Sequence, residues 1–288
     1  MIRGGQKRGV MPYLYLMPSL LVLGTFMVAP TVQVLYYSFT RYTVFTEPVW
    51  VGTENYQRLL ASDWFWSTLA SSLLYLLVTP VLVAVSMMAA VVLHAQLRGE
   101  RALRLLFFLP VITPTIVAAI AWRALLREEG GVVNSVLEGL GLRGVHWLTE
   151  RPWTLISPML VTLWKGFGFY MMIFLAGLMA VPKELREAAE IDGAGRFAVA
   201  RHIVLPRLVP LIVLVSIISS ISALKVFDEL FVTVRGVPVD QLTTVPMVYE
   251  KAFSEGDFGL ACALGMTLFV VILAFSLLNL WAGKRGQA

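Results

Sequence analysis

Few residues in this chain have side chains that could carry out covalent chemistry, and they do not cluster along the sequence. The three histidines, His94, His146 and His202, fall at segment ends or in different loops, and the only cysteine, Cys262, lies in an apolar run. A lone cysteine excludes a disulfide or a cysteine-based metal site within the chain. No Gly-x-x-x-x-Gly-Lys-Ser/Thr phosphate loop occurs, so any ATP should be hydrolysed on another polypeptide. The sequence therefore offers no convincing group of catalytic residues for an enzyme, and we expect no metal and no cofactor on this chain.

Charged and polar groups inside apolar stretches could instead act on a solute. Lys165 stands well inside such a stretch. An ammonium costs about 2.5–3.5 kcal/mol at the centre of a membrane helix, so its side chain should face a polar cavity or a carboxylate, or reach an interface. Lys225 precedes Asp228 by three residues and Glu229 by four, a spacing that places opposite charges on one helix face. An internal ion pair and a polar passage both fit this pattern. The residues that could line a passage near the middle of the membrane are Lys165, Tyr170, Ser219, Ser222, Lys225 and Asp228.

Six apolar stretches must position these groups. The 288 residues are 58% hydrophobic and 14% charged, with a mean hydropathy of +0.78, whereas soluble domains carry about 25% charged residues. Crossing the hydrocarbon takes about 20 apolar residues, and each crossing segment must be helical because its backbone groups have to be paired within it. The stretches run approximately over residues 13–37, 69–95, 103–125, 155–181, 208–230 and 260–281. We predict an all-α polytopic membrane protein with six transmembrane helices.

The loops differ in their content of lysine and arginine, and this difference predicts the orientation. Basic residues gather near the N-terminus, between the second and third stretches, between the fourth and fifth, and at the C-terminus. Because cytoplasmic loops carry the excess of Lys and Arg, both termini and residues 182–206 should be cytoplasmic. The net charge of +5 could suggest a nucleic-acid partner, but the basic residues form no single patch, so we expect none.

Two prolines interrupt the third stretch. Pro110 and Pro114 each remove a backbone donor and clash with the preceding turn, which predicts a kink or a local opening of the helix. A plain structural kink and a role in gating both remain open. On the outer side, residues 54–60 should form a short helix at the membrane surface, within a loop rich in aromatic residues.

The segment from Pro182 to Pro206 is polar, yet its residues favour helix rather than linker. Pro182 suits a first helical position, Glu187 lies towards the positive N-terminal end of the helix dipole, and Gly193 is a natural stop. A second helix is expected over about 196–203. Because a helix of two to three turns is marginal alone, the first should sit in a groove of a partner protein or else pack on its own chain.

The same segment carries a resemblance to a known family. Glu187-Ala188-Ala189, three residues, Gly193, nine residues and then Ile203-Val-Leu205-Pro206 resembles the EAA signature of permease subunits in binding-protein-dependent ABC importers. The extended form Glu-Ala-Ala-Glu-Ile-Asp-Gly-Ala-Gly is similar to that of the carbohydrate uptake group, the maltose and glycerol-3-phosphate type. Further echoes in other segments extend the resemblance over essentially the whole chain.

One turn departs from the pattern of that group. After the fifth segment the group usually has a Thr-Gly-Gly-Gly-Pro-like turn, whereas this chain has Thr233-Val-Arg235-Gly236-Val-Pro238. The departure bears on the solute rather than on transport itself.

The resemblance implies a function and a set of partners. The chain would be one of two permease subunits of an ATP-driven importer in the cytoplasmic (inner) membrane, taking up a sugar or a related polar solute. Its partners would be a second homologous permease, two ATP-binding subunits that hold ATP and Mg, and an extracytoplasmic solute-binding protein. Import of glycerol-3-phosphate or another non-sugar solute is an alternative. An ion-coupled secondary carrier would want a central carboxylate, which the first four stretches do not offer.

The resemblance also assigns roles to residues. It implies one permease domain over 1–288, with a core at about 69–283 and a cytoplasmic EAA loop at 182–206 between the fourth and fifth helices. A rigid helix with a small-residue face can pass the closure of an ATPase to the membrane helices as a rigid-body motion. The coupling residues implied in this way are Glu187, Ala188, Ala189, Asp192, Gly193, Ile203, Leu205 and Pro206.

Overall fold

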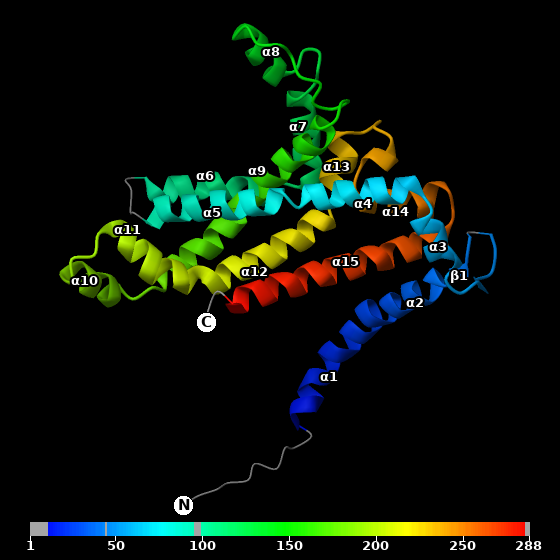
Figure 1. Ribbon diagram of the computed structural model, residues 1–288, viewed down its shortest axis with the longest axis horizontal. Helices are drawn as coiled ribbons and strands as arrows, with labels where there is room; N and C mark the ends of the chain where they lie inside the picture. The colour runs from blue at the N-terminus through cyan, green and yellow to red at the C-terminus, as the bar shows by residue number, and fades with distance from the viewer. Residues whose placement is uncertain (1–10, 44, 95–98, 286–288) are drawn as a thin grey trace, which may run out of the picture.

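The computed structural model describes residues 11–43, 45–94 and 99–285, and long helices make up most of them (Figure 1). Five helical spans are long and apolar enough to cross a membrane: Tyr13–Ser38, Asp63–His94, Trp153–Met179, Phe197–Leu224 and Phe258–Gly283. A sixth is the bent pair Glu100–Ile112 and Thr115–Leu125, whose axes meet at 99°. The predicted all-α polytopic architecture is confirmed, with six segments when the bent pair counts as one span.

The elements follow one another as a series of long helices with short helices at their ends. In the first half they are α1 (Met11–Leu23), the π-helical η1 (Gly24–Val28), α2 (Ala29–Ser38), the strands β1 (Thr40–Arg41) and β2 (Val49–Trp50), α3 (Glu54–Leu60), α4 (Asp63–Tyr75), α5 (Val78–His94), α6 (Glu100–Ile112), α7 (Thr115–Leu125) and α8 (Val132–Gly139). In the second half they are α9 (Trp153–Met179), α10 (Lys183–Ile191), α11 (Arg196–Val199), the π-helical η2 (Ala200–Val204), α12 (Leu205–Leu224), α13 (Asp228–Thr233), the 3-10 helix η3 (Val239–Gln241), α14 (Thr244–Tyr249), the π-helical η4 (Glu250–Ser254) and α15 (Phe258–Arg285).

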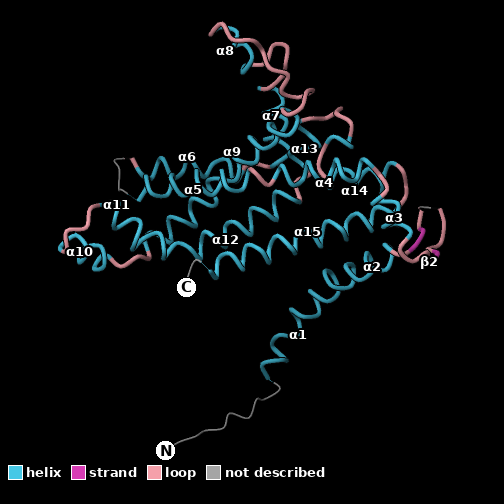
Figure 2. The backbone as a smooth tube through the Cα atoms, viewed as in Figure 1, coloured by secondary structure: helices cyan, strands magenta, loops and turns pink. Residues whose placement is uncertain are grey.

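Helices α5, α6, α9, α12 and α15 form a bundle, and α1 diverges from it (Figure 1). The largest apolar cluster lies where α5, α9 and α12 meet, around the buried side chains of Leu93, Met171, Phe174 and Val215. The first span, Tyr13–Ser38, lies at the edge of this bundle. Its second half, α2, packs along α15, but no residue in the apolar window of the span is buried. Figure 2 shows the short β1–β2 hairpin at the end of the bundle opposite α10.

The third stretch is broken where the two prolines predict a kink. Thr113 is extended, with φ −70° and ψ 129°, because a residue before proline is pushed out of the helical region. Pro114 has no backbone N–H to continue the ladder, and α7 starts again at Thr115. Helix α6 lies close against α9, since a Cβ at Gly168 would stand 2.0 Å from the carbonyl oxygen of Phe107. The predicted kink is therefore confirmed.

The fifth stretch ends earlier than predicted. We expected one helix over 208–230, but α12 stops at Leu224 and α13 begins at Asp228. The backbone N–H of Lys225 caps α12 by bonding to the carbonyls of Ala223 and Ile221. Lys225 and Asp228 thus belong to different helices, and the expected shared helix face is wrong. The acidic pair now begins a new helix, where the dipole favours negative charge.

The same stretch also begins earlier than expected, at the end that follows the segment 182–206. The second short helix expected over about 196–203 is not separate, because α11, η2 and α12 form one continuous span. The π-helical turn η2 ends two residues before Pro206, and η1 likewise ends two residues before Pro30. A wider turn makes room for the proline ring, which would otherwise clash with the carbonyl of the preceding turn.

Polar contacts tie the segment between α2 and α4 to the start of α15. The predicted short helix at 54–60 is confirmed as α3. Buried Asn55 donates to the carbonyls of Ser38 (3.0 Å) and Thr40 (2.8 Å). Arg58 forms an ion pair with Asp257 at 2.9 Å, just before α15. These contacts fix the end of α2 and the start of α15 against each other.

Candidate functional site

One polar group lies where α9 meets α13. Lys165, half-buried on α9, interacts electrostatically with Glu229 of α13. Buried Tyr75 of α4 lies near the same carboxylate, and its hydroxyl bonds to Thr162 at 2.9 Å. The charge of Lys165 thus acts on Glu229, which the sequence pattern instead assigned to Lys225, but no ion pair joins Lys165 to Glu229 among the described residues.

The other residues predicted to line a passage lie on α9, on α12 or at the break between α12 and α13. Tyr170 of α9 is buried and its side chain bonds to that of Ser222 on α12, so the structure brings these two together. Ser219 is buried, and its hydroxyl donates to the Val215 carbonyl of its own helix at 2.7 Å. Lys225 is exposed at the end of α12. Asp228, also exposed, stands in the first turn of α13.

An aromatic cluster beside these charges was not anticipated. Phe227 and Phe231 stack with ring centroids 5.0 Å apart. Tyr249 of α14 contacts both rings, at 5.5 and 5.6 Å, and Phe253 extends the row at 5.0 Å from Tyr249. Several of these rings are exposed, so the cluster offers flat apolar faces next to Asp228.

The polar segment at 182–206 forms α10 and the start of the fifth span, at one end of the molecule (Figure 1). Glu187, Ala188 and Asp192 are exposed, and Ala189 is half-buried. Apolar side chains on the same segment are also uncovered: Ile191 is 86% exposed and Phe197 77%. A short helix with uncovered apolar side chains has the character of a docking element.

Gly193 ends α10 in the way its type predicts. Its φ is +83°, a conformation that glycine adopts without steric cost. The turn is closed by bonds from the Asp192 amide to the Ala188 carbonyl (3.0 Å) and from the Ala194 amide to the Ala189 carbonyl (2.9 Å). The direction of the chain leaving α10 therefore depends on this glycine.

The last part of the signature lies at the start of the fifth span. Ile203 is half-buried in η2, whereas Leu205 and Pro206 are exposed at the beginning of α12. Leu205 and Phe197 line an apolar groove of about 520 Å³ between α5, α9 and the fifth span. This signature thus continues from α10 into a groove on the bundle.

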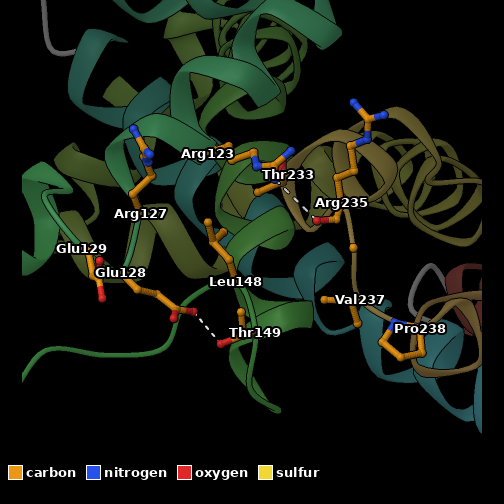
Figure 3. Close-up of a pocket in the computed structure, with 11 residues that line it drawn as sticks. Arg123, Arg127, Glu128, Glu129, Leu148, Thr149, Thr233, Arg235, Val237 and Pro238 are labelled. Atoms are coloured by element: carbon orange, nitrogen blue, oxygen red, sulfur yellow. Dashed lines mark hydrogen bonds between the residues drawn. The ribbon is translucent and has the colours of Figure 1, made fainter.

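A second cavity, also of about 520 Å³, lies between the ends of α7 and α13 (Figure 3). Arginines from both elements line it: Arg123 and Arg127 at the end of α7, and Arg235 after α13. Glu128 and Thr149 form part of another wall, joined by a hydrogen bond of 2.6 Å from the threonine hydroxyl. Sequence reasoning missed this cavity, because its walls are more than a hundred residues apart and only the packing of α7 on α13 unites them.

The ionisation of the acidic wall follows from its contacts. Partial burial of Glu128 opposes ionisation, but hydrogen bonds from Thr149 and His146 outweigh it and lower the pKa of this carboxyl. The same carboxylate, 3.1 Å from the ring Nδ1, raises the pKa of His146. The ionised carboxylate of Glu128 therefore already has its hydrogen-bond partners in Thr149 and His146.

Together the fold and these sites define a multi-pass, all-helical membrane protein with polar groups between its spans and an exposed helix at one end. Residues 82–285 match the family model of the binding-protein-dependent transport system inner membrane component, and the chain belongs to this family. It is accordingly a transport subunit of the inner membrane, as the sequence predicts.

Relatives of known type cover nearly the whole chain. It is 31% identical to the trehalose/maltose transport system permease protein MalF of Thermococcus litoralis, over 94% of this chain and 93% of that protein. It is 34% identical to the arabinooligosaccharides transport system permease protein AraP of Halalkalibacterium halodurans, over 96% and 90%. A bacterial alginate ABC transporter, solved with an alginate pentasaccharide-bound periplasmic protein, has a similar fold, with a TM-score of 0.82 at 21% identity over 96% of this chain and 95% of that one.

Proposed function

We propose that this chain is one of two permease subunits of an ATP-driven importer that takes up a carbohydrate. The observation that carries the proposal is the uncovered α10 and α11 segment, in a chain of a family whose members are transport components. The named relatives that transport trehalose, maltose or arabinooligosaccharides favour a sugar as solute.

The proposal places α10 in the cytoplasm, in a cleft of an ATP-binding subunit. Ile191 and Phe197 would be covered there, and the exposed Glu187 would meet polar groups of the partner. ATP and Mg would lie on that subunit. A second permease similar to this one, two ATP-binding subunits and an extracytoplasmic solute-binding protein would complete the complex, with both chain termini in the cytoplasm.

The solute would pass beside the polar group between α9, α12 and α13. Lys165, Glu229 and the Tyr170–Ser222 pair would exchange hydrogen bonds with sugar hydroxyls. The rings of Phe231 and its neighbours would pack against the apolar faces of sugar rings, as aromatic side chains do in ligand sites. Lys225 and Asp228, exposed at the break between α12 and α13, would complete the polar lining.

Reconstitution of the complex in proteoliposomes tests this function. Uptake of the sugar that is found bound to the co-purifying solute-binding protein should require ATP and that protein. Gly193→Pro should abolish coupling, because proline cannot adopt the φ of +83° that this turn needs. Gly141→Pro is the matched control, since Gly141 has a φ of +77° in an outer loop. Transport by this chain alone on an ion gradient would establish a secondary carrier instead.

A further inference from the structure

The cavity between α7 and α13 is lined by three arginines that form no ion pair with the described residues. Arg127 and Arg235 are exposed at its rim, and neither forms an ion pair with any residue that the structure describes. Arg123 donates to the backbone carbonyls of Val232 and Arg235, both at 3.5 Å, and has no ion pair within the described part of the chain. Figure 3 shows the three arginines around the cavity. Guanidinium groups in this arrangement are suited to a carboxylate or another planar or tetrahedral anion.

The acidic residues of the cavity do not neutralise these arginines. One carboxylate, Glu128, accepts hydrogen bonds from Thr149 and His146. Glu129 is exposed at the rim, where it can accept hydrogen bonds from hydroxyl groups of a solute. The walls therefore offer donors for an anion and an acceptor for sugar hydroxyls.

An unsatisfied polar atom points to a ligand at the same place. Thr233 lines the cavity and is fully buried, and its hydroxyl has no hydrogen-bond partner within the part of the chain that the structure describes. A buried hydroxyl without a partner costs roughly 1–3 kcal/mol. A ligand that hydrogen-bonds to Thr233 would remove that cost.

The cavity is also placed next to the proposed path of the solute. Thr233 follows Glu229 by four residues on α13, which puts both on one helix face, about 6 Å apart along the axis. On the other wall, Trp122 of α7 contacts Trp164 of α9 with ring centroids 6.0 Å apart. Arg123 and Lys165 are the residues that follow these tryptophans. The cavity thus borders α13, which carries Glu229, and α7, which contacts the helix that carries Lys165.

We propose that this cavity binds the anionic group of an acidic carbohydrate, and that the solute of the importer is such a sugar. The proposal rests on the proposed function. The volume of the cavity, about 520 Å³, lies within the 300–1,000 Å³ of typical small-molecule sites. The half-buried side chains of Leu148 and Val237 supply an apolar wall for the sugar ring.

Equilibrium binding to the assembled complex in nanodiscs, without ATP, tests the site. The probes are digalacturonate and its neutral counterpart galactobiose. Digalacturonate should bind and galactobiose should not, and the double variant Arg127→Gln/Arg235→Gln should bind digalacturonate at least about ten-fold more weakly. The control is Arg143→Gln, an exposed arginine outside the cavity, which should bind like the wild type. Equal binding of digalacturonate by the wild type and the double variant would overturn the proposal, as would binding of glycerol-3-phosphate alone.

The Thr233→Val variant separates a ligand role from a structural one. Because the hydroxyl has no intramolecular partner, valine should leave the thermal stability of the complex unchanged or slightly higher. Binding of digalacturonate should nevertheless weaken several-fold. A loss of stability without a loss of binding would contradict the assignment of Thr233.

Docking of the solute-binding protein is the competing use of the arginines. Its affinity for the complex is measured by fluorescence anisotropy, without solute. If the double variant weakens this docking and leaves digalacturonate binding intact, the arginines serve a protein contact and the proposal is wrong. ATP-dependent uptake of a neutral sugar, unchanged in the double variant, would overturn this proposal and leave the proposed function standing. Without any ATP-dependent uptake, the proposed function fails, and the equilibrium measurement still decides on the cavity.

Discussion

Replacing Ile191 by serine removes an apolar side chain that α10 holds in the open. It is 86% exposed in the chain alone, so almost all of its surface is available to a partner. Full burial of such a side chain contributes about 1.5–3 kcal/mol. If a groove of the ATP-binding subunit covers it, Ile191→Ser should cost about 2 kcal/mol of binding, which is a roughly 30-fold weaker affinity.

The assay is titration of the permease complex in nanodiscs with fluorescent ATP-binding subunit. Phe197→Ser should weaken binding by a similar factor, because this ring is 77% exposed on the adjoining α11. Phe45→Ser is the control, since Phe45 is 95% exposed but lies between β1 and β2, at the end of the bundle opposite α10. If Ile191→Ser and Phe197→Ser bind the ATP-binding subunit as tightly as the wild type, α10 and α11 do not dock it.

Three further predictions concern the packing of the helices and the loops that join them. Gly168→Ala should lower the melting temperature of the purified complex, because the new Cβ would lie 2.0 Å from a backbone oxygen of α6 and overpacking costs about 1–3 kcal/mol; Gly265→Ala, with open space around it, should not. Asn55→Leu leaves two backbone carbonyls without their buried donor, so it should also destabilise, by about 2 kcal/mol. Glu128→Gln should lower the pKa of His146 towards its ordinary 6.5, as followed by NMR titration of the histidine ring.

The directions of the two pKa shifts fix a pH window for the contact between Glu128 and His146. The pKa of His146 is raised by Glu128, so the stabilisation it brings is complete below 6.5 and is lost as pH rises through the raised value. The pKa of Glu128 is lowered, so its share is present above 4.5 and is lost as pH falls through the lowered value. The contact should be strongest between pH 4.5 and 6.5. An unchanged His146 titration in Glu128→Gln, or equal melting of Gly168→Ala and Gly265→Ala, would contradict these contacts.

How far the sequence predicts this fold depends on whether a feature is local. The break at Thr113 could be predicted, because Pro114 acts on the residue directly before it. The size of the bend could not, since the packing of α7 on α13 sets its 99°. The end of α12 at Leu224 also escaped prediction. Neither proline nor glycine stands between Leu224 and Asp228, and the apolar character continues across the break.

The same distinction applies to the sites. The signature from Glu187 to Pro206 is contiguous, so its spacing is readable in the sequence. The electrostatic effect of Lys165 on Glu229 cannot be read in this way, because the chain turns between α12 and α13 before it comes to Glu229. A helical-spacing rule pairs Glu229 with Lys225, and the three-dimensional arrangement overrides it. The arginine cavity is the hardest of these sites to predict, since more than a hundred residues separate α7 from α13 in the sequence.

The fifth span gives the proposed docking segment a direct physical link to the polar sites. It runs from Phe197, beside α10, to Leu224, four residues before Asp228, where α13 begins. The link is not uniformly stiff: η2 and the prolines Pro206 and Pro210 interrupt regular hydrogen bonding near its start. Beyond Pro210 the helix contains no further proline and packs against α5, α9 and α15. A movement of the docked α10 would therefore bend the span at this joint and move the rest of α12 as a rod, up to the break that leads into α13.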